Sequence, residues 1–170
     1  GTLFIDNLIT FIDEKTEIVP SLPEPRHPQR HIAHKIELKN VSFRYPGTER
    51  DVIKNMSATF EPGETVVLVG LNGAGKTTLI KLITRLYDPT EGVILLDGHD
   101  IREYDTSELY SIYGIIFQDF GRYAVSVREN VSFSDINAPT DEDRVSKAAK
   151  ESGAEDFIKN LPHGYDTALM

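Results

Sequence analysis

A glycine-rich segment that directly follows a run of aliphatic residues constrains this chain more than any other feature. Residues 70–77 read Gly-Leu-Asn-Gly-Ala-Gly-Lys-Thr, which fits the pattern G-x-x-x-x-G-K-[ST]. The preceding residues 65–69 are β-branched or aliphatic, which predicts a strand covered on both faces. Residues 76–86 carry apolar side chains at helical spacing. A strand, a glycine loop and a helix in this order predict a phosphate-binding loop.

The residue types of this loop suit a nucleoside triphosphate. Backbone N–H groups in a tight turn bind phosphate oxygens, and glycines allow the required backbone angles. We expect Lys76 to reach the β- and γ-phosphates and the Thr77 hydroxyl to ligate Mg²⁺. The alternative is a glycine turn without a ligand, which the flanking strand and helix patterns disfavour. The nucleotide-binding residues predicted here are Gly70, Leu71, Asn72, Gly73, Ala74, Gly75, Lys76, Thr77 and Thr78.

Composition limits the possible partners. The 170 residues suffice for one domain with its own core. A net charge of −9 disfavours duplex DNA or RNA, so we expect no nucleic acid partner. The absence of cysteine excludes disulfides and thiolate metal sites. Since no run approaches the roughly 20 apolar residues that span a bilayer, a membrane role would depend on a partner or on chain outside this sequence.

The pattern along the chain divides it in two. Residues 1–31 contain a helix pattern at 3–12, either packed on this domain or arriving from a preceding one, and a proline-rich linker at 13–30. Residues 32–170 form the predicted nucleotide-binding part. His27, His31 and His34 are expected to be solvated rather than metal ligands. Further strands are predicted at 35–43, 52–60, 93–96 and 113–118, and helices at 106–110, with Thr106 or Ser107 as cap, at 126–131, and from a cap near Thr140.

The loop and its flanks resemble the ATPases of ABC transporters. The Asn-Gly-Ala-Gly interior of residues 70–79 is typical of that family's P-loop, and the likeness extends over residues 36–169. Residues 41–46 resemble its aromatic loop, which implies that Tyr45 stacks on adenine; the alternative is a turn tyrosine that covers the sheet edge. Residues 113–119 resemble the stretch that ends in the Q-loop, which implies that Gln118 ligates Mg²⁺ and contacts the attacking water; the alternative is a polar strand end.

The resemblance also implies a fold. Residues 85–98 resemble the entry into the family's antiparallel β-subdomain, whereas 127–131 and 161–167 resemble the start and end of its helical subdomain in exporters. The expected fold class is therefore α/β, a P-loop NTPase core with an antiparallel β-subdomain and the start of a helical subdomain. Asp97 follows four apolar residues, as the aspartate of a Walker B strand does. It lies too close to the loop, so we expect a turn residue instead.

The function implied by the resemblance is the ATP-binding part of an exporter that uses ATP and Mg²⁺. Its partners would be a transmembrane domain and a second ATP-binding domain, at the cytoplasmic face of the cell membrane. Lys76 and Gln118 would be the catalytic residues. The main alternative is a soluble ABC-family ATPase. A different P-loop enzyme and a binding-only module also remain open, although a GTPase is disfavoured because no Asn-Lys-x-Asp occurs.

Several family motifs do not occur in these residues. Neither Leu-Ser-Gly-Gly-Gln, nor a Walker B strand with its glutamate, nor a switch histidine is present. Because hydrolysis needs a group that orients water and a second hold on Mg²⁺, we expect weak or moderate nucleotide binding and negligible hydrolysis. Residues 65–69 need parallel neighbours on both sides, one of them from Walker B. We therefore expect an exposed apolar edge and a tendency to associate.

Overall fold

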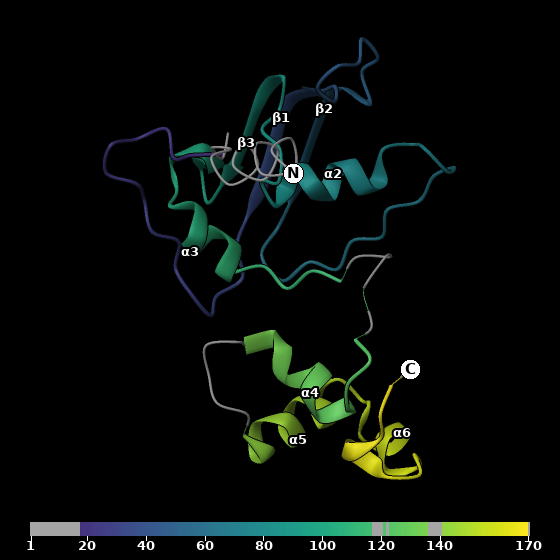
Figure 1. Ribbon diagram of the computed structural model, residues 1–170. Coiled ribbons are helices and arrows are strands. Elements are labelled where there is room, and N and C mark those ends of the chain that lie inside the picture. The colour runs from purple at the N-terminus through teal and green to yellow at the C-terminus, as the bar shows by residue number, and fades with distance from the viewer. Residues whose placement is uncertain (1–17, 117–120, 122, 136–140, 170) are drawn as a thin grey trace, which may run out of the picture. The chain divides into compact units, whose positions relative to one another are not determined.

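The computed structural model describes residues 18–116, 121, 123–135 and 141–169. They belong to two compact units, residues 1–114 and 115–170 (Figure 1). Each unit encloses an apolar core of its own. The helix predicted at residues 3–12 and the proposed ligand Gln118 lie outside the described residues. Within the described ranges, no helix has the length and hydropathy to cross a lipid bilayer.

The first unit is built on a four-stranded antiparallel sheet. Its order is β2-β1-β3-β4, so β1 lies between β2 and β3. The strands are β1 (Ile36–Phe43), β2 (Ile53–Phe60), β3 (Glu91–Leu96) and β4 (His99–Asp100). Leu38 of β1 lies opposite Ala58 on one side and Ile94 on the other. The strands predicted at 35–43, 52–60 and 93–96 are confirmed to within two residues.

A tight turn joins β3 to β4. Asp97 and Gly98 have φ values of 51° and 83°, the left-handed pair that two-residue hairpin turns favour. The Asp97 carboxylate accepts a hydrogen bond from the Lys35 backbone N–H at 2.9 Å and lies 2.6 Å from His34 Nδ1. Asp97 is therefore a turn residue, as predicted. The prediction of a solvated histidine is wrong at His34, whose side chain is only 11% exposed.

Two helices complete the core of the first unit. These are α2 (Lys76–Ile83) and α3 (Thr106–Ser111), which contribute Leu79, Leu82 and Leu109 to the apolar cluster of the sheet. The helix predicted at 106–110 is thus confirmed, but its cap is wrong. Asp105, and not Thr106 or Ser107, accepts the N-terminal hydrogen bond, from Glu108 N at 2.9 Å. A carboxylate there also suits the positive end of the helix dipole.

The prediction of a covered strand at residues 65–69 is wrong for this structure. These residues form no strand, and Val67 and Val69 are 77% and 90% exposed. Residues 113–116, the described part of another predicted strand, form none either. An extended segment needs a hydrogen-bonding neighbour, and no strand of the described sheet pairs with either segment. The expected exposure of apolar surface at 65–69 is confirmed.

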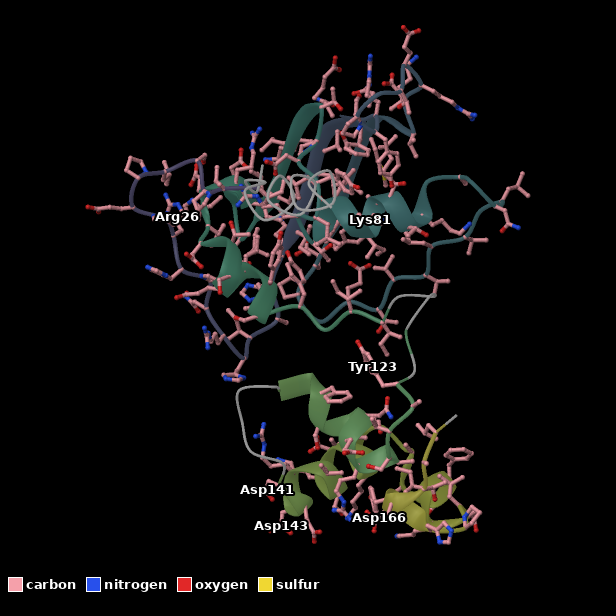
Figure 2. The ribbon with its side chains drawn as sticks, viewed as in Figure 1. Arg26, Lys81, Tyr123, Asp141, Asp143 and Asp166 are labelled. Atoms are coloured by element: carbon pink, nitrogen blue, oxygen red, sulfur yellow. The ribbon has the colours of Figure 1, made fainter. Side chains whose placement is uncertain are left out.

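The proline-rich segment packs along the first unit over part of its length. Ser21 N donates to Arg102 O at 2.7 Å, and Arg26 N donates to Glu103 O at 2.8 Å. Both acceptors belong to the short 3₁₀ helix η1 (Ile101–Glu103). The Arg26 side chain, labelled in Figure 2, also pairs with Glu103 at 2.6 Å. This part of the predicted linker is therefore fixed to the folded unit by backbone hydrogen bonds.

The second unit is helical. It contains α4 (Val127–Ser132), η2 (Phe133–Asp135), α5 (Glu142–Glu151), α6 (Glu155–Lys159) and η3 (Gly164–Asp166). The helix predicted at 126–131 is confirmed, and the one predicted from a cap near Thr140 begins one residue after its cap, Asp141. The buried core consists of Val127 of α4, Ala149 of α5 and Ile158 of α6.

Side-chain caps and one arginine stabilise this helical unit. Ser126 and Glu129 form a reciprocal capping box at the start of α4. The hydrogen bonds from Ser126 hold the pKa of Glu129 below its usual value. Arg128 bridges Glu142 at 3.0 Å and Asp166 at 3.1 Å, joining three helical segments. Figure 2 labels Asp166, together with Asp141 and Asp143 at the start of α5.

A substitution at Gly92 can test how closely β1 and β3 approach each other. Its φ is +81°, and an added Cβ would lie 2.3 Å from Asn40 O. We expect Gly92→Ala to lower the free energy of unfolding by more than about 2 kcal/mol, because left-handed strain and a backbone collision combine. Gly98→Ala is the matched control, since its φ is +83° with nothing within 4 Å of the added Cβ. Urea unfolding measures both, and equal losses would contradict the close approach.

Candidate functional site

The glycine-rich loop ends at the N-terminus of α2. Gly73 and Gly75 adopt φ values of 80° and 88°, a region that other residues enter only with strain. Ala74 N donates to Leu71 O at 3.2 Å, which closes a turn inside the loop. A Cβ on Gly75 would lie 3.2 Å from Val52 O, so a glycine suits this position for space as well as for angle. The loop therefore has the turn geometry that its sequence predicts.

The Lys76 side chain folds back onto the start of the loop. Its Nζ donates to Gly70 O at 2.7 Å and to Leu71 O at 2.8 Å. These two bonds hold the ammonium group beside the turn rather than in open solvent. A polyphosphate can compete with them, because a charged acceptor forms a stronger hydrogen bond with an ammonium than a neutral carbonyl does.

The two threonines that follow Lys76 lie in different environments. Thr77 is exposed, so its hydroxyl is available to a metal ion. Thr78 is only 6% exposed, and its Oγ1 lies 3.0 Å from the Tyr45 hydroxyl. The two predicted binding residues Thr78 and Tyr45 are thus brought together, although they are 33 positions apart in the sequence.

Tyr45 belongs to a small aromatic cluster. Its ring centroid lies 4.9 Å from that of Phe43 and 5.3 Å from that of Tyr87, both in edge-to-face arrangements. The Lys81 ammonium lies 5.8 Å from the Tyr45 centroid and 5.9 Å from that of Tyr87. The structure therefore places the proposed adenine-stacking residue beside the helix that follows the phosphate loop.

The C-terminal end of α2 is closed by a Schellman motif. Leu86 N donates to Lys81 O at 2.8 Å, and Arg85 N donates to Leu82 O at 3.0 Å. Arg85 occupies the left-handed position, with φ 55°, where glycine is usual. Neither a glycine nor a proline marks this helix end in the sequence. The apolar spacing predicted a helix as far as residue 86, whereas α2 ends at Ile83.

The Arg85 side chain explains why an arginine stands there. The residue is 1% exposed, and its guanidinium donates to Val19 O at 2.6 Å and to Tyr104 O at 3.4 Å. It also pairs with Asp88 at 3.2 Å. One buried cation thus joins the C-terminal end of α2, the residue that follows η1, and the proline-rich segment. No periodic or motif signal predicts such a residue, because two of its partners are backbone carbonyls of residues distant in the sequence.

Two tyrosines bind two further carbonyls at or just beyond this end of α2. The Tyr110 hydroxyl donates to Arg85 O at 3.0 Å, and the Tyr113 hydroxyl donates to Ile83 O at 2.9 Å. Burial, with smaller effects of Tyr104 and Asp97, holds the pKa of Tyr113 far above its usual value. The hydroxyl therefore stays protonated and continues to donate. These bonds hold the C-terminal end of α2 in place, and the glycine-rich loop lies at the opposite end of the same helix.

The predicted Mg²⁺ ligands can be compared with the described residues only at Thr77. They contain no group of three or more histidine, aspartate and glutamate side chains that could hold a metal ion. The exposed Thr77 hydroxyl is compatible with the metal ligand predicted there. Since Gln118 lies outside the described residues, its role stays a prediction.

Comparison with known proteins decides the family. The family model described as ABC transporter matches residues 53–169, which include the whole loop, α2 and the helical unit. The chain belongs to the ABC transporter family.

Individual ABC transporters support this assignment. A multidrug export ATP-binding/permease protein of Staphylococcus aureus is 44% identical over 135 residues, covering 79% of this chain and 23% of the relative. The ABC transporter B family member 22 of Arabidopsis thaliana is 38% identical over 169 residues, covering 98% of this chain and 14% of the relative. The chain therefore spans less than a quarter of the length of these relatives.

A solved ABC transporter shares the fold. The structure of a bacterial Atm1-family ABC exporter with ATP bound matches with a TM-score of 0.83 and 32% identity, over 99% of this chain and 28% of that one. The predicted fold class, a P-loop NTPase core with an antiparallel β-subdomain and the start of a helical subdomain, is thereby confirmed. The export relatives favour the exporter interpretation over a soluble ABC-family ATPase.

Arg85 offers a test of how the P-loop helix is held. We expect Arg85→Met to lower the free energy of unfolding by about 2 to 4 kcal/mol, because Val19 O and Tyr104 O lose their donor inside the protein. Arg50→Met is the control, since Arg50 is exposed and such surface changes stay within about 0.5 kcal/mol. Thermal or urea unfolding measures both variants. A loss of the same size in the two would show that the Arg85 contacts contribute nothing.

Proposed function

We propose that this chain is the ATP-binding part of an ABC exporter, with a phosphate cradle formed by residues 70–77 and the backbone of Thr78. The observation that carries the proposal is the glycine turn at the N-terminus of α2, with the Lys76 ammonium held against its first two carbonyls. Backbone N–H groups of such a turn and the positive end of the helix attract a polyphosphate. The family match over residues 53–169 supports ATP as the nucleotide.

The residues of the cradle, together with Tyr45 and Gln118, have separate tasks in this proposal. Lys76 leaves the loop carbonyls and neutralises the β- and γ-phosphates. The Thr77 hydroxyl and Gln118 would hold Mg²⁺, and the bound ion would supply positive charge beside the phosphate oxygens. Tyr45 stacks on the adenine ring, which suits a half-buried aromatic side chain beside α2. Gln118 also orients the attacking water, so that Lys76 and Gln118 are the catalytic residues.

In the whole transporter we propose two kinds of partner. A transmembrane domain would place the chain at the cytoplasmic face of the membrane, and a second ATP-binding domain would complete the hydrolytic site. The names of the relatives, an export ATP-binding/permease protein and an ABC exporter, support this arrangement. In that arrangement, residues 1–31 connect to the preceding domain and residues 32–170 belong to the ATP-binding domain. These 170 residues would bind ATP without hydrolysing it at a measurable rate.

The decisive test removes the Lys76 ammonium. We expect Lys76→Ala to weaken Mg-ATP binding at least about a hundredfold, since hydrogen bonds between charged groups and desolvated phosphates are among the strongest in proteins. Isothermal titration calorimetry measures the affinity, and circular dichroism shows that the variant is folded. Lys54→Ala is the matched control, because Lys54 is exposed on β2. ATP binding that survives in Lys76→Ala would rule out the cradle.

A further inference from the structure

The Tyr45 ring is held on several sides before any ligand binds. Phe43 and Tyr87 contact it edge to face, at centroid distances of 4.9 and 5.3 Å. Tyr45 and Tyr87 are partly buried against the core of the first unit, and Phe43 is part of that core. An aromatic side chain packed in this way has little rotational freedom, so its orientation is set by its neighbours.

Two of those neighbours come from the helix that follows the phosphate loop. Thr78 Oγ1 lies 3.0 Å from the Tyr45 hydroxyl, and Lys81 Nζ lies 5.8 Å from the centre of the ring. Positions three apart on a helix lie on the same face, so one face of α2 carries both contacts. Figure 2 labels Lys81 on this helix. The Lys81 ammonium also lies 5.9 Å from the Tyr87 centroid, within the range of cation–π attraction to both rings.

The hydroxyl of Thr78 is committed to this cluster. Only 6% of the residue is exposed, and its hydroxyl lies within hydrogen-bond distance of the Tyr45 hydroxyl. A buried hydroxyl without a partner costs free energy, so each of these hydroxyls favours the position of the other. The side chain of Thr78 therefore serves the aromatic cluster, whereas Lys76 and Thr77 remain for the phosphates.

We propose that Thr78 and Lys81 are positioning residues that fix Tyr45 as a platform for the base of a purine nucleotide. The inference rests on the proposed function and assigns a task within the same site. Because the platform and the phosphate loop are both attached to α2, the distance between them is set by one rigid helix. A ligand that carries both a purine and a polyphosphate gains from this spacing, whereas inorganic polyphosphate uses the loop alone.

The test compares Mg-ATP with magnesium and inorganic tripolyphosphate as probes, by titration calorimetry on the full 170-residue chain. Tyr45→Phe keeps the ring and Thr78→Val keeps the shape, and each removes one hydroxyl. We expect each to weaken ATP binding about three- to tenfold, with the double variant no weaker than the worse single one. Tripolyphosphate affinity should stay the same in all three, and Thr78→Ser should restore ATP binding.

Substitution of Lys81 provides an independent test of the same proposal. Lys81→Met keeps the aliphatic stem and removes the charge, so ATP binding should fall about two- to fivefold, whereas Lys81→Arg should restore it. Circular dichroism shows whether each variant is folded. If a Lys81 substitution instead disturbed the fold of α2, the affinities for ATP and for tripolyphosphate would fall together, and the positioning role of Lys81 would be overturned.

The outcomes separate the two proposals. If Thr78→Val weakens tripolyphosphate as much as ATP, its hydroxyl acts on phosphate, and the positioning role is overturned while the cradle stands. Full ATP affinity in Tyr45→Phe, or multiplied losses in the double variant, also overturns the positioning role. If the wild-type chain binds neither probe, or if Lys76→Ala binds both normally, the proposed function fails, and the platform fails with it.

Discussion

The burial of one face of α2 against the antiparallel sheet is the interaction on which the rest of the first unit depends. Leu79 and Leu82 are 4% and 0% exposed and belong to the same apolar cluster as Leu38 and Ile94 of the sheet. Burying leucine side chains of this kind contributes about 1.5 to 3 kcal/mol each. The helix is too short to be stable alone, so this packing keeps it folded. The loop geometry follows, since the loop ends where the helix begins.

Both ends of α2 are then adapted to different tasks. At its N-terminus, Gly75 is left-handed and the backbone N–H groups are open to an anion. At its C-terminus, the Schellman turn and the hydroxyls of Tyr110 and Tyr113 bind the carbonyls. The helix is therefore closed on the side away from the proposed ligand and open on the side toward it. Free N–H groups at a helix N-terminus are what the binding of an anion there requires.

The sequence predicted those elements whose signals are local. The strand β1, the turn at Asp97 and the acidic first turn of α5 all depend on neighbouring residues, and the structure confirms them. The strict alternation predicted along β1 is wrong after Leu38, since Lys39 and Asn40 are both exposed and the next three residues are all buried. Prediction failed where the outcome depends on distant chain. Residues 65–69 have the composition of a buried strand, but a strand also requires a paired neighbour. Arg85 was missed because its burial follows from Val19 and Tyr104, which no local pattern connects to it.

The candidate site shows the same division. The P-loop residues are readable from one motif, and the contact between Tyr45 and Thr78 could not be, because it joins the end of β1 to α2 across 33 positions. Of the predicted residues, the structure brings together Tyr45, Lys76, Thr77 and Thr78 around the start of one helix. Gln118 lies outside the described residues.

The contact between Arg85 and Val19 has a consequence for where this fold begins. A cut placed at the change in composition near residue 31 would remove Val19, Ser21 and Arg26, and with them a carbonyl on which a buried guanidinium depends. The remaining chain would keep the glycine-rich loop and its helix, but the buried Arg85 guanidinium would lose the carbonyl that accepts its shortest hydrogen bond. The proline-rich stretch has the composition of a spacer, but it is also part of the folded unit, because it supplies an acceptor for a buried charge.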